Sequence, residues 1–319
     1  MLQTLDKNLR NALEKTVKAA RDTAEQGAKI ALEQIGVGEI NPFPHLSESE
    51  REIRRRLRVH GRQLGDFRNA RGEQELTRLI EETAYEHWHR MLFARFLAEN
   101  NLLMFDGVAV TLEECDEIAA DEGAANGWEL AARFAAHMLP QIFRLDSPVF
   151  ELALPPEHEQ KLERLVTDLP LETFTASDSL GWVYQFWQAN NKERINKSEV
   201  KIGARELPAV TQLFTEPYMV SFLLDNSLGA WWAARRLSES DFKRADSETE
   251  LRQKAAIPGV PLEYLRFVKT PFGESLNGQN AGEVWTPAAG TFEQWPKQLS
   301  ELKTLDPCCG SGHFLVAAI

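Results

Sequence analysis

The chain has 319 residues, of which 43% are hydrophobic and 26% charged, and its formal net charge is −12. This composition fits a globular protein of about two domains, and the acidic balance argues against a uniformly basic nucleic-acid binder. No apolar run approaches the roughly 20 residues of a membrane helix, and the N-terminus lacks the apolar core of a secretory signal. We therefore expect a cytoplasmic protein that does not act at a membrane.

Residues 3–35 carry apolar side chains at helical spacing, and alanine is frequent among them. The pattern predicts one long amphipathic helix that lies on another helix or on a partner. Gly36 and the Asn41-Pro42-Phe43-Pro44 run predict a linker after it. Residues 1–45 thus form a first segment, an N-terminal helix with its linker.

An arginine-rich helix is expected next, because Ser47 and Glu50 have the spacing of a capping box. Its arginines either contact nucleic-acid phosphates or pair with acidic neighbours on a solvated helix face, and both interpretations stay open. The candidate DNA contacts are Arg51, Arg54, Arg55, Arg58 and Arg62.

Three further helical segments follow, at residues 74–100, at 111–140 behind a Thr111–Glu114 capping box, and at 179–187. The aromatic residues of the last one either stack on bases or fill a core, and their spacing favours the core. The polar run 190–199 is expected to be a loop. Together these segments predict a helical domain over residues 46–205.

A helix start is predicted at Phe214-Thr215-Glu216-Pro217, where Thr215 can cap the helix and Pro217 suits its first turn. Free N–H groups at such a start can receive a carboxylate, and a plain capped helix without a ligand is the alternative. The amphipathic pattern then runs through Trp232. Residues 238–296 are mixed, and only Leu262–Val268 alternates in the manner of a strand or hairpin arm.

The chain closes on Leu305-Asp306-Pro307-Cys308-Cys309-Gly310-Ser311-Gly312-His313-Phe314, which predicts a buried strand over 302–305, a glycine turn and a helix. The Lys of a P-loop and the third glycine of a dinucleotide fingerprint are both missing after Gly312. An ordinary turn without a ligand remains the alternative. Cys308, Cys309 and His313 have no second ligand pair beside them, so we expect no metal.

The Asp306–Leu315 run closely resembles the S-adenosylmethionine-binding motif I of the amino-group DNA methyltransferases, chiefly the N6-adenine enzymes. Residues 212–218 are similar to motif X of the same enzymes, although Glu216 separates the Thr and Pro that are adjacent in the common form. The resemblance implies that the Gly310–Gly312 loop and Asp306 face the methionine end of the cofactor, with Phe314 beside it. The implied cofactor-binding residues are Phe214, Thr215, Pro217, Asp306, Pro307, Cys309, Gly310, Ser311, Gly312 and Phe314.

Motif X before motif I is the gamma-type order, and residues 181–228 resemble the PglX-type methyltransferases of phage-defence systems, the BREX and DISARM groups. Residues 83–97 also look like the helix in front of many adenine methyltransferase domains. This resemblance implies a mainly α N-terminal region, followed at 206–319 by the beginning of an α/β Rossmann-like S-adenosylmethionine-dependent domain. It further implies double-stranded DNA and other phage-defence proteins as partners.

No catalytic residue can be assigned, because the [Asn/Asp/Ser]-Pro-Pro-[Tyr/Phe] motif that holds the target amine is absent; Pro155-Pro156 lies between Leu154 and Glu157. We therefore interpret the chain as the N-terminal fragment of a longer adenine-specific DNA methyltransferase of a phage-defence or restriction system, inactive by itself. The alternative is a non-catalytic helical module that binds a defence-complex partner or DNA.

Overall fold

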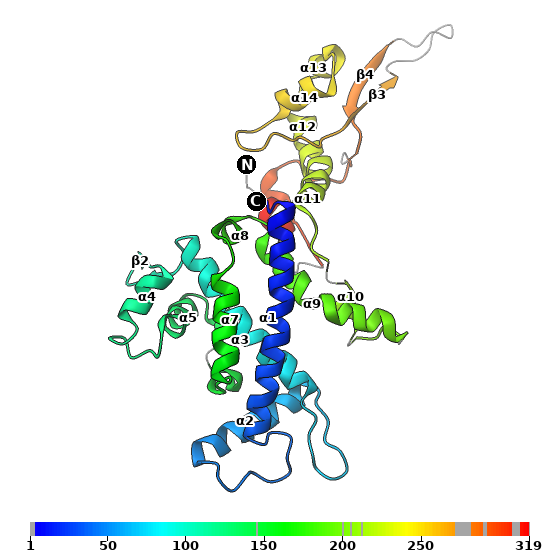
Figure 1. Ribbon diagram of the computed structural model, residues 1–319. Coiled ribbons are helices and arrows are strands. Elements are labelled where there is room, and N and C mark those ends of the chain that lie inside the picture. The colour runs from blue at the N-terminus through cyan, green and yellow to red at the C-terminus, as the bar shows by residue number, and fades with distance from the viewer. Residues whose placement is uncertain are drawn as a thin grey trace. The chain divides into compact units, whose positions relative to one another are not determined.

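The computed structural model describes residues 4–144, 146–199, 201–204, 206–211, 213–271, 282–289, 292–307 and 313–318. They divide into two compact units, residues 2–213 and residues 214–319, and each is described by itself (Figure 1). Most of the described residues are helical. None of the described helices combines the length and the apolar character that crossing a membrane requires.

The first unit is built on one long helix, α1 (Lys7–Gln34), whose first N–H groups are capped by the Asp6 carboxylate. Its apolar side is mostly alanine, and these small side chains let other helices approach closely. The partners of α1 are α3 (Thr77–Glu99), α7 (Pro156–Thr167) and α9 (Ser179–Ser198). The predictions of a single long helix and of its helical partners are both confirmed.

Helix α2 (Glu48–Leu64) begins with the expected capping box, in which the Ser47 hydroxyl accepts from the Glu50 N–H and the Glu50 carboxylate accepts from the Ser47 N–H. Helix α3 has no capping side chain at its own N-cap. The buried carboxylate of Asp66 accepts instead from the N–H groups of Arg78 and Leu79, at 2.8 and 3.0 Å. A residue outside the helix therefore satisfies its start.

A hydrophobic core that includes Leu97, Leu130 and Phe143 joins the end of α3 to the short elements that follow it. The predicted helical stretch 111–140 is two helices, because a turn in which Gly123 has a φ of 65° separates them. Gly127 lets the second helix approach the first, since a Cβ there would lie 2.7 Å from the Asp116 nitrogen. The Thr111–Glu114 capping box is confirmed. The elements are β1 (Met104–Phe105), β2 (Val108–Ala109), α4 (Leu112–Ile118), α5 (Gly127–Met138), α6 (Pro140–Phe143), η1 (Pro148–Glu151) and α8 (Leu171–Thr175).

Helix α9 is longer than expected, since it continues through the polar run 190–198 that was predicted to be a loop. The loop prediction is wrong because long polar side chains sustain a helix when they pair along it, as Lys197 does with Glu193. The aromatic residues of α9 fill the core: Trp187 is buried and stacks on Trp88, with ring centroids 6.2 Å apart. Helix α10 (Leu207–Thr211) completes the unit.

The second unit opens with a continuous helical stretch, α11 (Pro217–Leu224), the π-helical turn η2 (Asp225–Gly229) and α12 (Ala230–Arg236). Two short helices and an antiparallel hairpin pack behind it, with Leu251, Leu265 and Phe267 in the core. Lys269 pairs with Trp285 at the centre of the hairpin. These elements are α13 (Glu239–Arg244), α14 (Glu248–Ala255), β3 (Phe267–Pro271) and β4 (Glu283–Pro287).

The buried strand predicted over residues 302–305 is wrong. These residues have no strand conformation, and the Leu305 side chain is 86% exposed. An isolated strand is unstable without a neighbour to satisfy its backbone, and the only strands of this unit among the described residues, β3 and β4, pair with each other. The chain continues through η3 (Leu299–Glu301) and ends in α15 (His313–Ala318), which confirms the helix expected there. A Rossmann-like sheet therefore stays a prediction.

Candidate cofactor-binding site

The first candidate element is the start of α11. Pro217 occupies the first helical turn as predicted, but the N-cap is Glu216 and no side chain caps the helix. The prediction that Thr215 caps it is wrong, because Glu216 moves the threonine one position too far from the helix. Phe214, Thr215 and Pro217 are all half-buried.

The second candidate element is α15, which packs against α11 within this unit (Figure 1). Phe314, the second residue of α15, is half-buried, as is Asp306 ahead of it, whereas Pro307 is exposed. The intervening residues Cys309, Gly310, Ser311 and Gly312 lie outside the described part of the chain. The fold thus brings the helices of the two predicted motifs together although about a hundred residues separate them in sequence.

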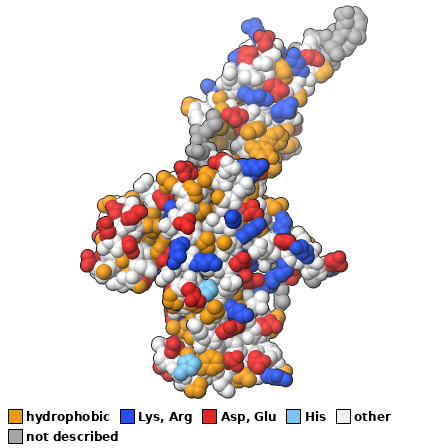
Figure 2. Space-filling model, viewed as in Figure 1, with side chains coloured by type: hydrophobic (Ala, Val, Ile, Leu, Met, Phe, Trp, Pro, Cys, Tyr) orange, Lys and Arg blue, Asp and Glu red, His pale blue; other side chains and the backbone are white. Residues whose placement is uncertain are grey.

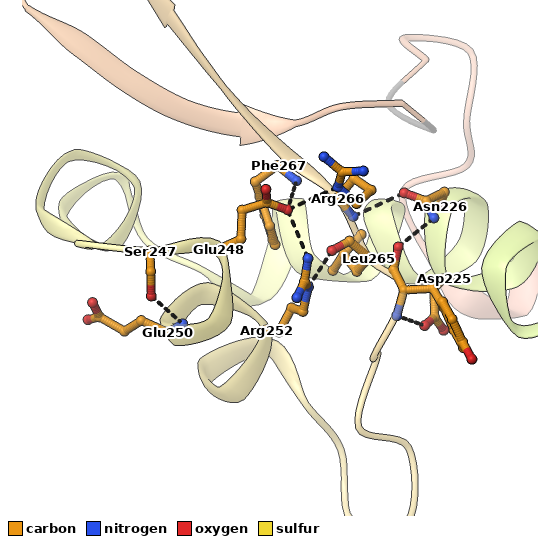
Figure 3. A network of polar contacts seen from close by, with 10 residues as sticks. Asp225, Asn226, Ser247, Glu248, Glu250, Arg252, Leu265, Arg266 and Phe267 are labelled. Atoms are coloured by element: carbon orange, nitrogen blue, oxygen red, sulfur yellow. Dashed lines mark hydrogen bonds and ion pairs between the residues drawn. The ribbon is translucent and has the colours of Figure 1, made fainter.

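A polar network braces this helical stretch from behind (Figure 3). In the π-helical turn, the Asn226 side chain donates to the Tyr264 carbonyl at 2.7 Å and accepts from the Arg266 N–H at 3.0 Å, as a neighbouring strand would. The buried Asp225 carboxylate accepts from the Tyr264 N–H at 2.9 Å. Two neighbouring side chains of the helix therefore hold the segment ahead of β3 by its backbone groups.

Glu248, the first residue of α14, ties the same segment to its own helix. Its Oε2 accepts from Arg252 Nη2, Arg266 Nε and the Phe267 N–H, at 2.9, 3.2 and 3.2 Å, and Arg252 Nε donates to the Leu265 carbonyl at 2.6 Å (Figure 3). Burial opposes ionisation, but these donors together lower the pKa of Glu248. The carboxylate is therefore charged at neutral pH and holds α14 and β3 together.

Burial raises the pKa of Asp225, and the Tyr264 N–H opposes that rise only in part. Sequence analysis missed this network, because it assigned no role to residues 238–296. The available signal was the Asp225-Asn226 pair inside an otherwise apolar helical pattern, where short polar side chains are expected to bond to backbone. The π-helical turn agrees with that signal, since such turns gather at functional sites.

The arginines predicted to contact DNA are bonded within the first unit. The buried guanidinium groups of Arg54 and Arg58 donate to backbone carbonyls after α1: Arg54 to Gly36 and Glu39 at 2.8 and 2.5 Å, and Arg58 to Val37 at 2.5 Å. Arg51 donates to the Leu46 and Pro44 carbonyls, Arg55 pairs with Glu52, and Arg62 donates to the Arg58 carbonyl. These contacts favour the alternative in which the cluster serves the fold.

Charge on the visible surface gives the same indication, because acidic and basic side chains are interspersed over the face shown in Figure 2. Arg55, which is 61% exposed, is surrounded by Glu48 and Glu52. A phosphate backbone is attracted by an uncompensated basic surface. DNA contact through Arg55 or Arg62 stays a prediction, whereas Arg54 and Arg58 are engaged in the interior.

Comparison with known proteins finds similarity to adenine-specific methyltransferases. No family model matches the chain. It is 26% identical over 362 aligned residues to the adenine-specific methyltransferase PglX of Lacticaseibacillus casei (strain Zhang), an alignment that covers 94% of this chain and 28% of that protein. It is also 29% identical over 186 residues to the adenine-specific methyltransferase BrxX of Escherichia coli O9:H4 (strain HS), covering 57% of this chain and 13% of that protein.

The chain is therefore similar to two adenine-specific methyltransferases, PglX and BrxX. The first relative is matched along nearly the whole chain, so the similarity includes the helical unit as well as the proposed cofactor region. The chain spans less than a third of the length of either relative.

Proposed function

We propose that this chain is part of an adenine-specific DNA methyltransferase of a phage-defence system, and that residues 214–319 hold S-adenosylmethionine. The observation that carries the proposal is the packing of α11 on α15, the helices that follow the two predicted cofactor motifs. The similarity to two adenine-specific methyltransferases supports the same function. Double-stranded DNA would be the substrate and the adenine N6 the methyl acceptor.

The residues fit a cofactor with an apolar, flat end and a charged end. Phe214, ahead of α11, and Phe314, within α15, are half-buried aromatic side chains, and Asp306 is a half-buried carboxylate. The aromatic rings would pack against the adenosine, and the N–H groups at the start of α11 would receive the methionine carboxylate. When bound, the cofactor supplies a sulfonium methyl group. Thr215, Pro217, Pro307, Cys309 and the Gly310–Gly312 loop with Ser311 would line the remainder of the site.

Calorimetric titration of the chain with S-adenosylmethionine tests the cofactor site. We expect binding heat, and Phe214→Ala weakens binding about tenfold because a packed aromatic contact is worth on the order of 1.4 kcal/mol. The matched control is Phe292→Ala, an exposed phenylalanine of the same unit outside the proposed site, which leaves the affinity unchanged. Absence of both binding heat and thermal protection would refute the cofactor assignment.

The reaction itself is tested with a polypeptide of the length of the relatives, incubated with bacterial DNA and S-adenosylmethionine. We expect N6-methyladenine in the digested DNA, detected by mass spectrometry, and loss of the product with Asp306→Ala. If methylated cytosine, RNA or protein appeared instead, the substrate assignment would be wrong while the cofactor assignment could stand.

A further inference from the structure

A pocket lies in the helical unit, formed entirely by residues between positions 87 and 159. It has a volume of about 410 Å³, and its lining residues come from α3, α5, α7 and the segment around η1, where α5, α7 and η1 all contact α3. None of its lining residues belongs to the proposed cofactor site. Charged side chains of both signs and two aromatic residues, Trp128 and Phe150, line it.

Arg90 provides the main hydrogen-bond donor in this pocket. Its guanidinium group lies over the Phe150 ring, 5.0 Å from the centroid, and burial lowers its pKa. Within the described part of the chain, no carbonyl or carboxylate bonds to this guanidinium. A partly buried guanidinium with several open donors is costly unless an acceptor reaches it.

Glu159 provides the opposite charge from α7. Burial raises the pKa of its carboxyl group, and the nearby Arg90 lowers it. The two groups are therefore close enough to affect each other's charge, yet among the described residues they form neither an ion pair nor a hydrogen bond with each other or with any other side chain. Each can bond to a group that enters between them.

The other ionisable side chains of the pocket already have hydrogen-bond or ion-pair partners. The Glu129 carboxylate accepts from the Ala125 N–H and from Arg133, and Glu151 pairs with Arg56. The imidazole of His87 bonds to the Val149 carbonyl at 3.0 Å, and burial lowers its pKa to about 4, so the ring is neutral. Among the described charged groups, a guest therefore meets one donor, Arg90, and one acceptor, Glu159, that are not already engaged, beside the neutral side chains of Asn126 and Trp128. Because these two charges balance, the guest has no net charge at the contact.

We propose that this pocket binds a guanine base, with Arg90 donating to the base acceptors and Glu159 accepting from its donors. Guanine offers two adjacent acceptors, O6 and N7, which match an arginine fork. Its N1–H and N2 amine lie on the adjacent Watson–Crick edge and match a carboxylate. The half-buried Trp128 gives the flat base a stacking surface. Adenine has a donor, the N6 amine, where guanine has O6, so it would face Arg90 with the wrong group.

The test uses the whole chain titrated with guanosine 5′-monophosphate, adenosine 5′-monophosphate and inosine 5′-monophosphate. We expect the guanosine nucleotide to bind with a dissociation constant below about 1 mM and the adenosine nucleotide to bind at least about tenfold more weakly. Inosine, which lacks the N2 amine, lies between them. Equal binding of the three nucleotides overturns the proposal.

Variants assign the contacts. Glu159→Gln and Arg90→Met each weaken guanosine nucleotide binding about tenfold or more, because one partner of a charged hydrogen bond is lost. The matched control is Glu163→Gln, another half-buried carboxyl one turn further along α7 that does not line the pocket. If Arg90→Met fails to fold, the comparison of the three nucleotides on the unchanged chain still tests the guanine site. Unchanged affinity in folded Glu159→Gln overturns the proposal.

A third titration, with a single-stranded oligothymidine that carries one guanine, tells whether the bound guanine belongs to DNA or to a free nucleotide. Tighter binding of the oligonucleotide than of the mononucleotide assigns the pocket to guanine within DNA, and the reverse assigns it to a free nucleotide. Both results support a guanine site, and failure of both ligands refutes it. S-adenosylmethionine titration is independent of this result, so the two proposed sites can fail separately.

Discussion

Arg54 and Arg58 act at the residue scale as a clamp on the turn that follows α1. The Arg58 guanidinium bonds to the carbonyls of Val37, Glu39 and Gly72, and burial together with the neighbouring arginines lowers its pKa to about 10. Buried backbone carbonyls in a turn need hydrogen-bond donors, and here side chains of α2 supply them. The arginine-rich sequence therefore indicates internal bonding at these two positions.

Replacement of Arg58 by methionine tests this clamp. We expect Arg58→Met to lower the free energy of unfolding of the helical unit by about 3 kcal/mol, because several buried carbonyls lose a charged donor. The control is Arg55→Met, an exposed arginine of the same helix, for which no measurable loss is expected because an exposed ion pair contributes little. Urea unfolding followed by circular dichroism measures both, and equal losses in the two variants would contradict the clamp.

Two histidines of α3 make the helical unit sensitive to acid. Burial lowers the pKa of His87 and of His89 to about 4, and the ring of His89 stacks on Tyr85 and Phe93. In the unfolded chain a histidine titrates near pH 6.5, so between about pH 6.5 and pH 4 the unfolded state binds more protons. Stability is therefore fully present above pH 6.5 and falls as the pH is lowered toward 4.

The expected loss is about 2 kcal/mol for each histidine at pH 5. His89→Phe keeps the ring stack and removes the titration, so the difference in unfolding free energy between pH 7.5 and pH 5 shrinks by about that amount. His137→Gln, at an exposed position of α5, serves as the control and keeps the full difference. The same pH difference in His89→Phe as in the unchanged chain would show that His89 does not titrate as stated.

Local sequence rules predict some residue roles and miss others for one reason. The capping boxes at Ser47 and Thr111 were predictable because both partners lie within one turn. Asp66, which caps α3 from twelve and thirteen residues away, and the arginine clamp were not, because their partners are set by tertiary packing. Thr215 failed as a cap because a single inserted residue, Glu216, changes which side chain faces the helix start.

At the scale of elements, Asn226 joins a helix to the segment that leads into β3. Asn226→Ala removes its bonds to the Tyr264 carbonyl and the Arg266 N–H, so we expect a loss of about 2 kcal/mol and faster amide exchange at Arg266. Ser227→Ala is the control, because the Ser227 hydroxyl donates only to carbonyls of its own helix. Hydrogen exchange followed by mass spectrometry over residues 262–268 gives the readout, and unchanged protection would contradict the bracing role.

In this chain, sequence periodicity predicted helices more reliably than it predicted strands. Helices α1, α3 and α15 were predictable because their hydrogen bonds are local, whereas the strand expected at 302–305 depended on neighbours that its own sequence does not encode. The length of α9 was underestimated because the polar run 190–198 was interpreted as a loop. Side-chain pairs such as Lys197 with Glu193 extend the helix through it. The candidate site follows the same division: its helix positions were predictable, and the network behind them was not.

At the scale of the whole molecule, each compact unit has a hydrophobic core of its own. Leu130 belongs to a core of the unit formed by residues 2–213, and Leu251 to the core of residues 214–319. Composition and length predicted about two domains, but the division between Leu213 and Phe214 depends on which residues contact each other in space. A core confined to one unit contributes to the cooperativity of that unit alone.

Calorimetric unfolding of the whole chain should therefore show two transitions. Leu130→Ala and Leu251→Ala each remove a fully buried side chain at a cost of about 2–4 kcal/mol, and each is expected to lower the temperature of one transition only. S-adenosylmethionine, under the proposed function, raises the transition that Leu251→Ala lowers and leaves the other in place. A single transition lowered by both variants would mean that the two cores unfold as one, and protection of the Leu130-dependent transition would place the cofactor in the helical unit.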